Sequence, residues 1–453
     1  MEPLEKPKYI TNKWSLAQPK SSIFFEGNFI FKNRIFRLLC LQSTLFLQCL
    51  LLHPTFSKSS KAILIRRGLA PINFLGSIKF FLENLAKPLE DNCLINFEIA
   101  FLSEYFAAKS IEWGFFKGPI YSTPLRFIKG TQRWNKEDLS EDEKKRQEGE
   151  SCSKLRLVGW TVYQISSFRG LGFSWGMAHE ANNSSLLEII FRYFRVKIVT
   201  IITTCLIIAS RDSIDGKAIN LLRDLGVPEF SGLNLMAELF LNILFGICLC
   251  CKLDNGFTFC NIIVKVAYKF LTCTHAPKSM CDFLNPLYYP HFFYSPHTTN
   301  SLADFWGKGW HQLFRRIFLI CGGKPAIYLA NLFGASERIT KSIGIMGVFL
   351  ASATFHEYLP WAVFQGSTPN PYIPFRTFPG SGFFFMVQPI GIFIEPYIIP
   401  WIPQWAGGGK LWVWSFLAIV ATPFRQQYIG PYRFANTIPP FSKLSWKDFA
   451  MPT

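Results

Sequence analysis

The sequence has little charge for its length. Charged residues make up 17% of the 453 residues, whereas 49% are hydrophobic and 17% are aromatic. Soluble globular chains usually contain about 25% charged residues, because their whole surface faces water. The composition therefore argues against a soluble protein and predicts a chain that sits in a membrane.

A dense basic domain is also missing. Lysine and arginine outnumber the acids and give a formal net charge of +17, but they are scattered between apolar runs. This scatter argues against nucleic acid as a partner, since nucleic-acid binding proteins gather their basic residues on one face. Anionic lipid headgroups or an anionic cosubstrate are the partners that we expect.

The sequence lacks a secretory signal peptide and a disulfide pattern. It opens with the polar stretch MEPLEKPKYITNKWSLAQPKSS, and apolar residues first gather near Ile35, so we expect that first apolar run to be an uncleaved anchor. Several of the 12 cysteines lie inside apolar runs, which predicts reduced thiols. A metal site at Cys248, Cys250 and Cys251 is the alternative, but no nearby histidine or carboxylate would complete its ligand set.

Long apolar runs are the main feature that the sequence does have. A helix needs roughly 20 residues to cross the hydrocarbon core. We therefore predict an all-α fold, a polytopic integral membrane bundle with about seven to nine transmembrane helices and one interfacial helix. Tryptophan and tyrosine near the ends of the runs support spanning. The clearest runs are Ile35–Leu52, Ile198–Ser210, Gly232–Cys251, Phe257–Leu271, Ile343–Gly366, Gly382–Trp401 and Leu411–Phe424.

Two segments interrupt this pattern. Residues 129–156 mix charges of both signs and predict a solvent-exposed loop. Pro286–Asn300 is rich in proline and aromatic residues and cannot form one continuous helix. The sequence thus divides into a polar segment, a divergent membrane region, a charged loop, a membrane core and a tail, at 1–34, 35–128, 129–156, 157–425 and 426–453.

The stretch SLADFWGKGWHQLFRRIFLI, Ser301–Ile320, predicts an amphipathic helix. Ser301 can cap its start, and Asp304 is placed as the acidic partner of a capping box. At about 100° per residue, one face holds the apolar residues Trp306, Trp310, Leu313, Phe314 and Ile317. The other face holds Asp304, Lys308, His311, Gln312 and Arg315. This pattern fits a helix that lies at the membrane surface, and it fits equally a segment that binds a cosubstrate.

His356 and Glu357 stand in the apolar stretch GVFLASATFHEYLPWAVF. A helix of about 22 residues from Ile343 would cross the bilayer core and place His356 at depth. An ionisable group there is a functional candidate, although a neutral histidine bonded to a neighbouring helix is the alternative. Glu357 points about 100° away from His356 on such a helix, so the two need not touch.

Two common catalytic motifs are absent around this histidine. The zinc motif H-E-x-x-H would need a histidine where the chain has Pro360, so we expect no metal. No G-x-S-x-G sequence marks a serine hydrolase. Proton transfer is the chemistry that fits a lone histidine in a membrane, either as a general base or as a relay in a transporter.

Three ordered blocks carry a family resemblance. FWGKGWHQLFRR at Phe305–Arg316 and SATFHEY at Ser352–Tyr358 resemble the wax synthase-like branch of membrane-bound O-acyltransferases. RGLGFSWG at Arg169–Gly176 is similar to an element of fungal members. Phe173 stands where tryptophan is common in the family, and Gly309 replaces a frequent arginine.

The resemblance implies acyl transfer from a coenzyme A thioester to an alcohol, without a covalent acyl-enzyme or a permanently bound cofactor. His356 matches the catalytic histidine and would take the proton of the attacking hydroxyl. His311, Trp306 and Trp310 match the tryptophan-histidine block and would shape the donor side of a tunnel. By charge and position, Lys308, Arg315 and Arg316 would bind the phosphates of acyl-CoA.

The substrates are less closely defined than the reaction. The fungal-type block favours acetyl-CoA as donor and a hydrophobic terpenoid or meroterpenoid alcohol as acceptor, in secondary metabolite biosynthesis. A long-chain wax ester synthase is the alternative within the enzyme class, and a proton-coupled transporter is the alternative outside it. We expect a location in the endoplasmic reticulum or another endomembrane.

Overall fold

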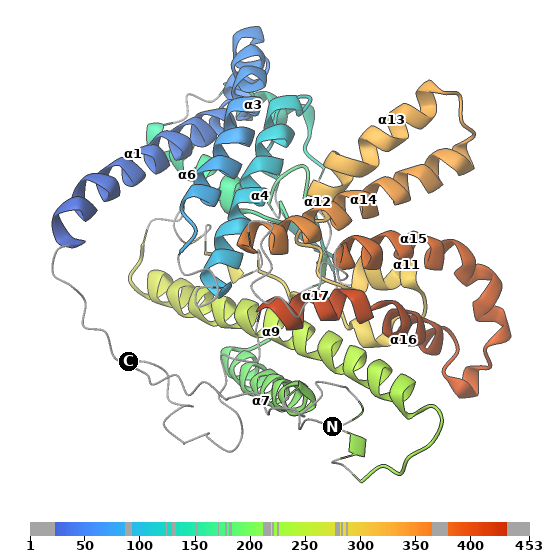
Figure 1. The fold of residues 1–453 in the computed structure, drawn as a ribbon. Coiled ribbons are helices and arrows are strands. Elements are labelled where there is room, and N and C mark those ends of the chain that lie inside the picture. The colour runs from blue at the N-terminus through green and yellow to red at the C-terminus, as the bar shows by residue number, and fades with distance from the viewer. Residues whose placement is uncertain are drawn as a thin grey trace.

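The chain folds into an assembly of helices (Figure 1). The structure is a computed structural model that describes residues 23–86, 93–123, 125–128, 133–136, 138–149, 153–170, 172–176, 179–180, 184–211, 219, 222–223, 226–276, 281, 284–286, 289–364 and 379–432. Three described helices are long and apolar enough to cross a membrane, namely Leu233–Cys273, Glu337–Ala362 and Gly380–Trp401. Shorter apolar helices include Phe36–Leu50 and Gly409–Val420. These findings confirm the all-α membrane fold.

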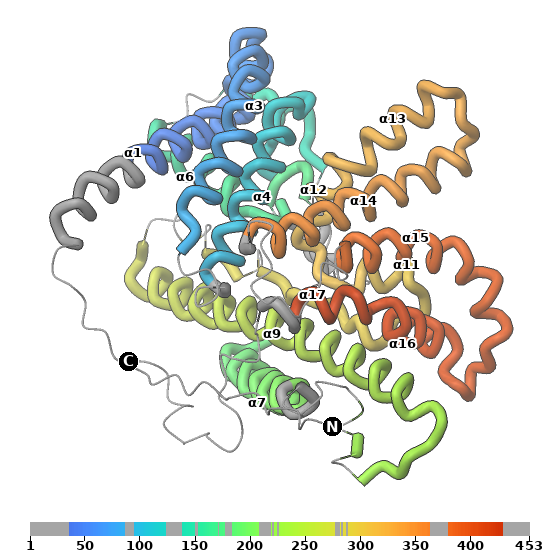
Figure 2. The backbone as a smooth tube through the Cα atoms, in the orientation of Figure 1, coloured from blue at the N-terminus to red at the C-terminus, as the bar shows by residue number. Residues whose placement is uncertain are grey.

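The N-terminal region contributes an upright group of helices, in which α3 and α4 lie side by side (Figure 2). Helix α1 begins at Ile23, inside the segment 1–34 that the sequence predicts as a separate polar region. The elements up to residue 180 are α1 (Ile23–Leu50), α2 (Pro54–Ser57), α3 (Ser60–Glu83), α4 (Cys93–Phe115), β1 (Leu125–Ile128), β2 (Arg133–Lys136), α5 (Glu141–Gly149), α6 (Lys154–Ser166) and β3 (His179–Glu180). The three strands form a small antiparallel sheet in the order β1-β2-β3.

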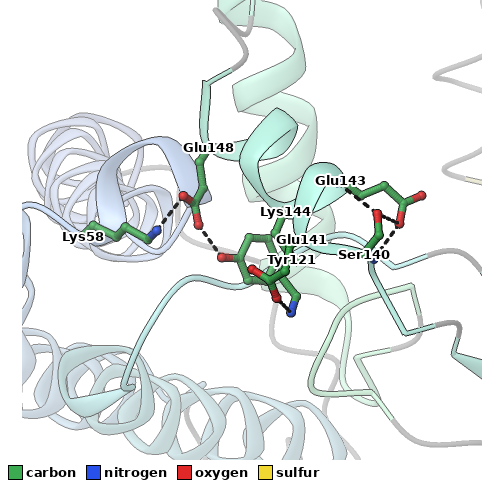
Figure 3. Close-up of polar contacts among 7 residues, drawn as sticks. All are labelled: Lys58, Tyr121, Ser140, Glu141, Glu143, Lys144 and Glu148. Carbon is green, nitrogen blue, oxygen red and sulfur yellow. Dashed lines mark hydrogen bonds and ion pairs between the residues drawn. The ribbon is translucent and has the colours of Figure 1, made fainter.

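The charged segment 129–156 contains regular structure where the sequence predicts a loop. Ser140 and Glu143 form a capping box for α5: the Ser140 N–H donates to Glu143 Oε2 over 2.8 Å, and the Glu143 N–H donates to Ser140 Oγ over 3.2 Å (Figure 3). Glu148 then contacts Lys58 and Tyr121 (Figure 3). Local capping and this docking order a helix that buries none of its own residues.

Helix α9 (Leu233–Cys273) joins two predicted spans into one helix of 41 residues. The polar residues between the two apolar runs are thus part of the same helix. Among them, Asp254 pairs with Arg192 of α7 (Leu186–Arg211) at 2.9 Å. Because Arg192 compensates its charge, the Asp254 carboxylate can stay between the two helices without contact with water.

The predicted amphipathic helix Ser301–Ile320 is also wrong as one continuous element. Its elements are α11 (Leu302–Asp304), the π-helix η3 (Phe305–Gly309), α12 (Arg315–Phe318) and the π-helix η4 (Leu319–Gly323). Residues 310–314 form a bend, in which Trp310 has an extended conformation with ψ 157°. The predicted cap is confirmed, because the Asp304 N–H donates to Ser301 Oγ over 3.0 Å. The described part of Pro286–Asn300 holds turns and the short 3₁₀ helix η2 (Pro296–Thr298), as predicted.

Helix α14 (Glu337–Phe364) packs against α4, α13, α15 and α12, and further elements follow α13 and α14 along the chain. Helix α13 spans Lys324–Leu332, and the elements after α14 are α15 (Gly380–Ile398), η6 (Ile399–Trp401), η7 (Gln404–Ala406), α16 (Gly409–Val420) and α17 (Thr422–Tyr432). An aromatic core forms where α4, α9, α14, α15 and α17 meet. Helix α17 crosses the predicted boundary at 425, and its residues Phe424 and Tyr428 belong to the aromatic core.

Candidate functional site

An apolar cavity of about 390 Å³ lies inside the aromatic core. Residues from α4, α9, α14, α15, α16 and α17 line it, together with η3 and the bend that follows. Four of the predicted site residues are among them: Trp306, Trp310, His311 and His356. The fold thus brings together two histidines that are separated by α12, η4 and α13. The size and apolar lining suit a hydrophobic small molecule.

His356 is held in one tautomer by its own helix. Its Nδ1 lies 2.8 Å from the carbonyl oxygen of Ser352, one turn earlier in α14. A carbonyl only accepts hydrogen bonds, so Nδ1 carries the proton and Nε2 is the acceptor of the neutral ring. The ring stacks on Phe385 of α15, with centroids 4.1 Å apart. His356 is therefore oriented as a base whose free nitrogen is available to a ligand in the cavity.

Pro360 and Tyr428 hold the backbone at His356. In a regular helix the His356 carbonyl would accept the N–H of residue 360, but proline has no N–H. The hydroxyl of Tyr428, from α17, donates to this carbonyl over 3.0 Å. Tyr428 is 7% exposed and lines the cavity. Sequence analysis missed this residue, although Pro360 four positions after His356 signals that the carbonyl needs a donor from elsewhere.

Glu357 faces away from the cavity, as the helical spacing predicts. Its Oε2 accepts the N–H of Gly382 over 2.8 Å, and its Oε1 accepts a hydrogen bond from Gln427. Gln427 also accepts the N–H of Ser381 over 2.7 Å. The carboxylate therefore joins α14 to the start of α15 and to α17. It fixes the position of the helix that carries His356 and has no direct access to the cavity ligand.

Trp306 and Trp310 form an aromatic wall of the cavity. The indole N–H of Trp306 donates to Gln388 of α15 over 3.0 Å, and Gln388 is fully buried. Gln312 Nε2 donates to the carbonyls of Trp306 and Trp310, over 3.1 and 2.7 Å. These bonds stabilise the bend after η3, which turns both indoles and His311 inward. A straight helix would have placed His311 with the charged residues on the outer face.

His311 is neutral at ordinary pH. Burial lowers the pKa of His311 to about 3, with smaller contributions from His356 and Arg169. The ring stacks on Phe292 with centroids 5.1 Å apart. Its Nδ1 is buried and has no hydrogen-bond partner among the described residues. A neutral ring beside a cavity can hold a ligand oxygen or proton, which suits positioning better than repeated proton exchange.

The three basic residues predicted to bind phosphate do not line the cavity. Lys308 is exposed and lies 3.0 Å from Asp304. Arg315 is half-buried. Arg316 pairs with the buried Glu112 of α4, and its guanidinium lies 4.4 Å from the Trp175 ring centroid. Glu112 also pairs with the buried Lys109 over 3.0 Å, so Arg316 is the second cation on this carboxylate. The contacts of Arg316 with Glu112 and Trp175 leave Lys308 and Arg315 as the more accessible basic residues, and the assignment of Arg316 to a phosphate site stays a prediction.

The block Arg169–Gly176 supports the site from outside. Arg169 donates to the carbonyls of His291 and Phe292 over 3.0 and 3.1 Å, and so fixes the segment that precedes η2. Gly170 has φ +65°, and a Cβ atom there would lie 2.3 Å from the Trp175 ring. Only glycine suits this turn. Phe173, at the position where the family often has tryptophan, is 1% exposed.

Comparison with known proteins agrees with two of the three blocks, Phe305–Arg316 and Ser352–Tyr358. A family model described as membrane bound O-acyl transferase matches residues 289–385, which include both cavity histidines. An acetyltransferase of the fungus Arthrobotrys oligospora is 29% identical over 135 residues, or 26% of this chain. The match spans about a quarter of that relative, 26% of its length. The resemblance to membrane-bound O-acyltransferases is thereby confirmed for residues 289–385.

Proposed function

We propose that this chain, whose cavity segment matches the membrane-bound O-acyltransferases, transfers an acetyl group from acetyl-CoA to a hydroxyl of a hydrophobic terpenoid or meroterpenoid. Acyl transfer within a membrane is supported by the family match at residues 289–385. The acetyl donor is supported by the similarity to a fungal acetyltransferase. The apolar cavity supports a hydrophobic acceptor.

The observation that carries the proposal is the fixed tautomer of His356. Because Nδ1 donates to the Ser352 carbonyl, Nε2 can accept the proton of an alcohol in the cavity. The alcohol oxygen bonds to the thioester carbon as this proton leaves. The carbon–sulfur bond then breaks, and the coenzyme A thiolate takes the proton back from the imidazolium. The products are the ester and free coenzyme A, and His356 returns to its neutral form.

The other cavity residues assist this reaction by position. Neutral His311 can donate a hydrogen bond to a substrate oxygen, and the Trp306 and Trp310 rings exclude water from the thioester. The phosphates of the donor would bind outside the apolar cavity, where Lys308 and Arg315 are the more accessible candidates from the sequence. Endomembranes, where hydrophobic alcohols partition, are the location that we propose.

Release of free coenzyme A by purified membranes tests the proposal. Membranes that contain the chain receive a hydrophobic alcohol and one acyl-CoA at a time, from acetyl to palmitoyl. Thiol release that depends on the alcohol and is fastest with acetyl-CoA supports the proposal. Fastest release with long acyl chains would instead indicate a wax ester synthase. Proton movement across sealed vesicles, without thiol release, would indicate a transporter.

A further inference from the structure

A second, polar groove lies between α7 and α9, on the side of α9 that faces α7. It has a volume of about 400 Å³. Its lining includes Lys197, Lys252 and Asn255. Thr200 and Thr204 also line it, but the Thr200 hydroxyl donates to the Val196 carbonyl over 2.8 Å and the Thr204 hydroxyl contacts Cys248 at 3.4 Å. No aspartate or glutamate is found among the described residues that line the groove, so the charged residues of its lining are both lysines.

The two lysines lie at one level of an antiparallel helix pair. Thr204 of α7 contacts Cys248 of α9 at 3.4 Å, and Arg192 of α7 contacts Asp254 of α9 at 2.9 Å. Residues with higher numbers on α7 thus contact residues with lower numbers on α9, as in an antiparallel pair. Lys197, between Arg192 and Thr204, faces the part of α9 that contains Lys252.

The position of Lys197 and Lys252 along the helix pair matches the boundary of a bilayer core. The helical stretch Leu233–Cys251 is about 28 Å long, close to the roughly 30 Å of a hydrocarbon core. Lys252 follows it directly, and on α7 the apolar run begins directly after Lys197, at Ile198. When these apolar stretches span the core, both ammonium groups emerge among the lipid phosphates. The whole of α9, with 41 residues or about 61 Å, is too long to lie within the core along the membrane normal. With the core at Leu233–Cys251, the apolar run Phe257–Leu271, which the sequence predicts as a span, lies outside the core.

We propose that this groove binds the headgroup of an anionic phospholipid. The phosphate would lie between Lys197 and Lys252, and the acyl chains would run along the exposed side chains of Ile198 and Ile202 on the core side. Asn255 is 8% exposed, and its Oδ1 has no partner among the described residues. It can accept a headgroup hydroxyl, so phosphatidylglycerol suits the groove.

Lipid titration of the full chain in neutral detergent tests the proposal. Native mass spectrometry would count bound dioctanoyl phosphatidylglycerol, with dioctanoyl phosphatidylcholine as the neutral comparison. Each lysine near an anionic phosphate contributes about 1 kcal/mol, so Lys197→Gln or Lys252→Gln should weaken phosphatidylglycerol binding about fivefold. The double variant should weaken it about 25-fold if the two act independently. Lys269→Gln, an exposed lysine further along α9, is the matched control and should bind as the wild type does.

Three results would overturn the proposal. Equal binding of phosphatidylglycerol and phosphatidylcholine would show that the groove does not select an anionic headgroup. Unchanged phosphatidylglycerol binding by the double variant would place the lipid elsewhere. A raised KM for acyl-CoA in the double variant, with lipid binding retained, would assign the groove to the phosphates of the donor. The double variant Lys197→Arg, Lys252→Arg keeps both charges and should keep binding, which separates charge loss from misfolding.

Discussion

The hydrogen bond from Tyr428 to the His356 carbonyl permits a quantitative test of how the base is held. Tyr428→Phe removes the donor and leaves a buried carbonyl that Pro360 cannot satisfy. An unsatisfied buried polar group costs about 1 to 3 kcal/mol. We therefore expect Tyr428→Phe to lower the free energy of unfolding by about this amount, and to slow acyl transfer as the His356 backbone loosens.

A double-mutant cycle with Pro360→Ala isolates that bond. Alanine at 360 restores an N–H that can donate to the His356 carbonyl within the helix. In that background the carbonyl no longer needs the tyrosine hydroxyl, although the hydroxyl still contacts Ser381. Tyr428→Phe should therefore cost about 1 kcal/mol less than it does in the wild type. Denaturant unfolding in detergent micelles, followed by tryptophan fluorescence, measures all four proteins. An equal cost of Tyr428→Phe in both backgrounds would refute the reasoning, because the carbonyl would then not depend on the hydroxyl.

Three further substitutions separate structural from chemical roles. Arg316→Met removes one of the two cations that pair with the buried Glu112 and leaves Lys109, so the free energy of unfolding should fall by about 2 kcal/mol, while the KM for the donor changes no more than that for the alcohol. His311→Gln should flatten the pH dependence of stability: the neutral folded ring has a pKa of about 3, below the usual value of about 6.5. The folded state therefore binds fewer protons between these values, and His311 should account for about 2 kcal/mol of the stability that the wild type loses on going from pH 7.5 to pH 5. Glu357→Gln should lower kcat less than about tenfold and should also lower the free energy of unfolding, because the contacts of Glu357 join neighbouring helices.

Each of these expectations has a contradicting result. A selective rise in donor KM for Arg316→Met, without loss of stability, would assign that residue to a phosphate site. Equal pH slopes for wild type and His311→Gln would mean that the ring is not the titrating group. A kcat loss of 100-fold or more in a well-folded Glu357→Gln protein would require a direct part in the reaction.

The helical membrane fold and the principal histidine follow from the sequence because they depend on local composition. An apolar run of sufficient length excludes most alternatives to a buried helix, and His356 stands out inside such a run. The outward direction of Glu357 follows from helical spacing alone. These features can be predicted without knowing which distant residues contact them.

The bend at residues 310–314 depends on contacts that the local pattern does not contain. Periodicity treats Ser301–Ile320 as one helix and places His311 on its charged face. The structure turns His311 inward because Gln312 bonds two carbonyls and Gln388, far along the chain, holds Trp306. The partner of Asp254 within α9 is likewise a distant residue, Arg192 of α7, which the local pattern does not reveal.

The rate of acyl transfer by His356→Ala tests the central claim most directly. Purified wild type and variant would be compared at saturating acetyl-CoA and alcohol, with thiol release as the readout and unfolding midpoints as the control for folding. A positioned base contributes on the order of 100- to 10,000-fold, so the variant should lose that much in kcat while its unfolding midpoint stays near that of the wild type. Near-normal turnover by the variant, or a loss that only follows loss of folded protein, would contradict the assignment of His356 as the base.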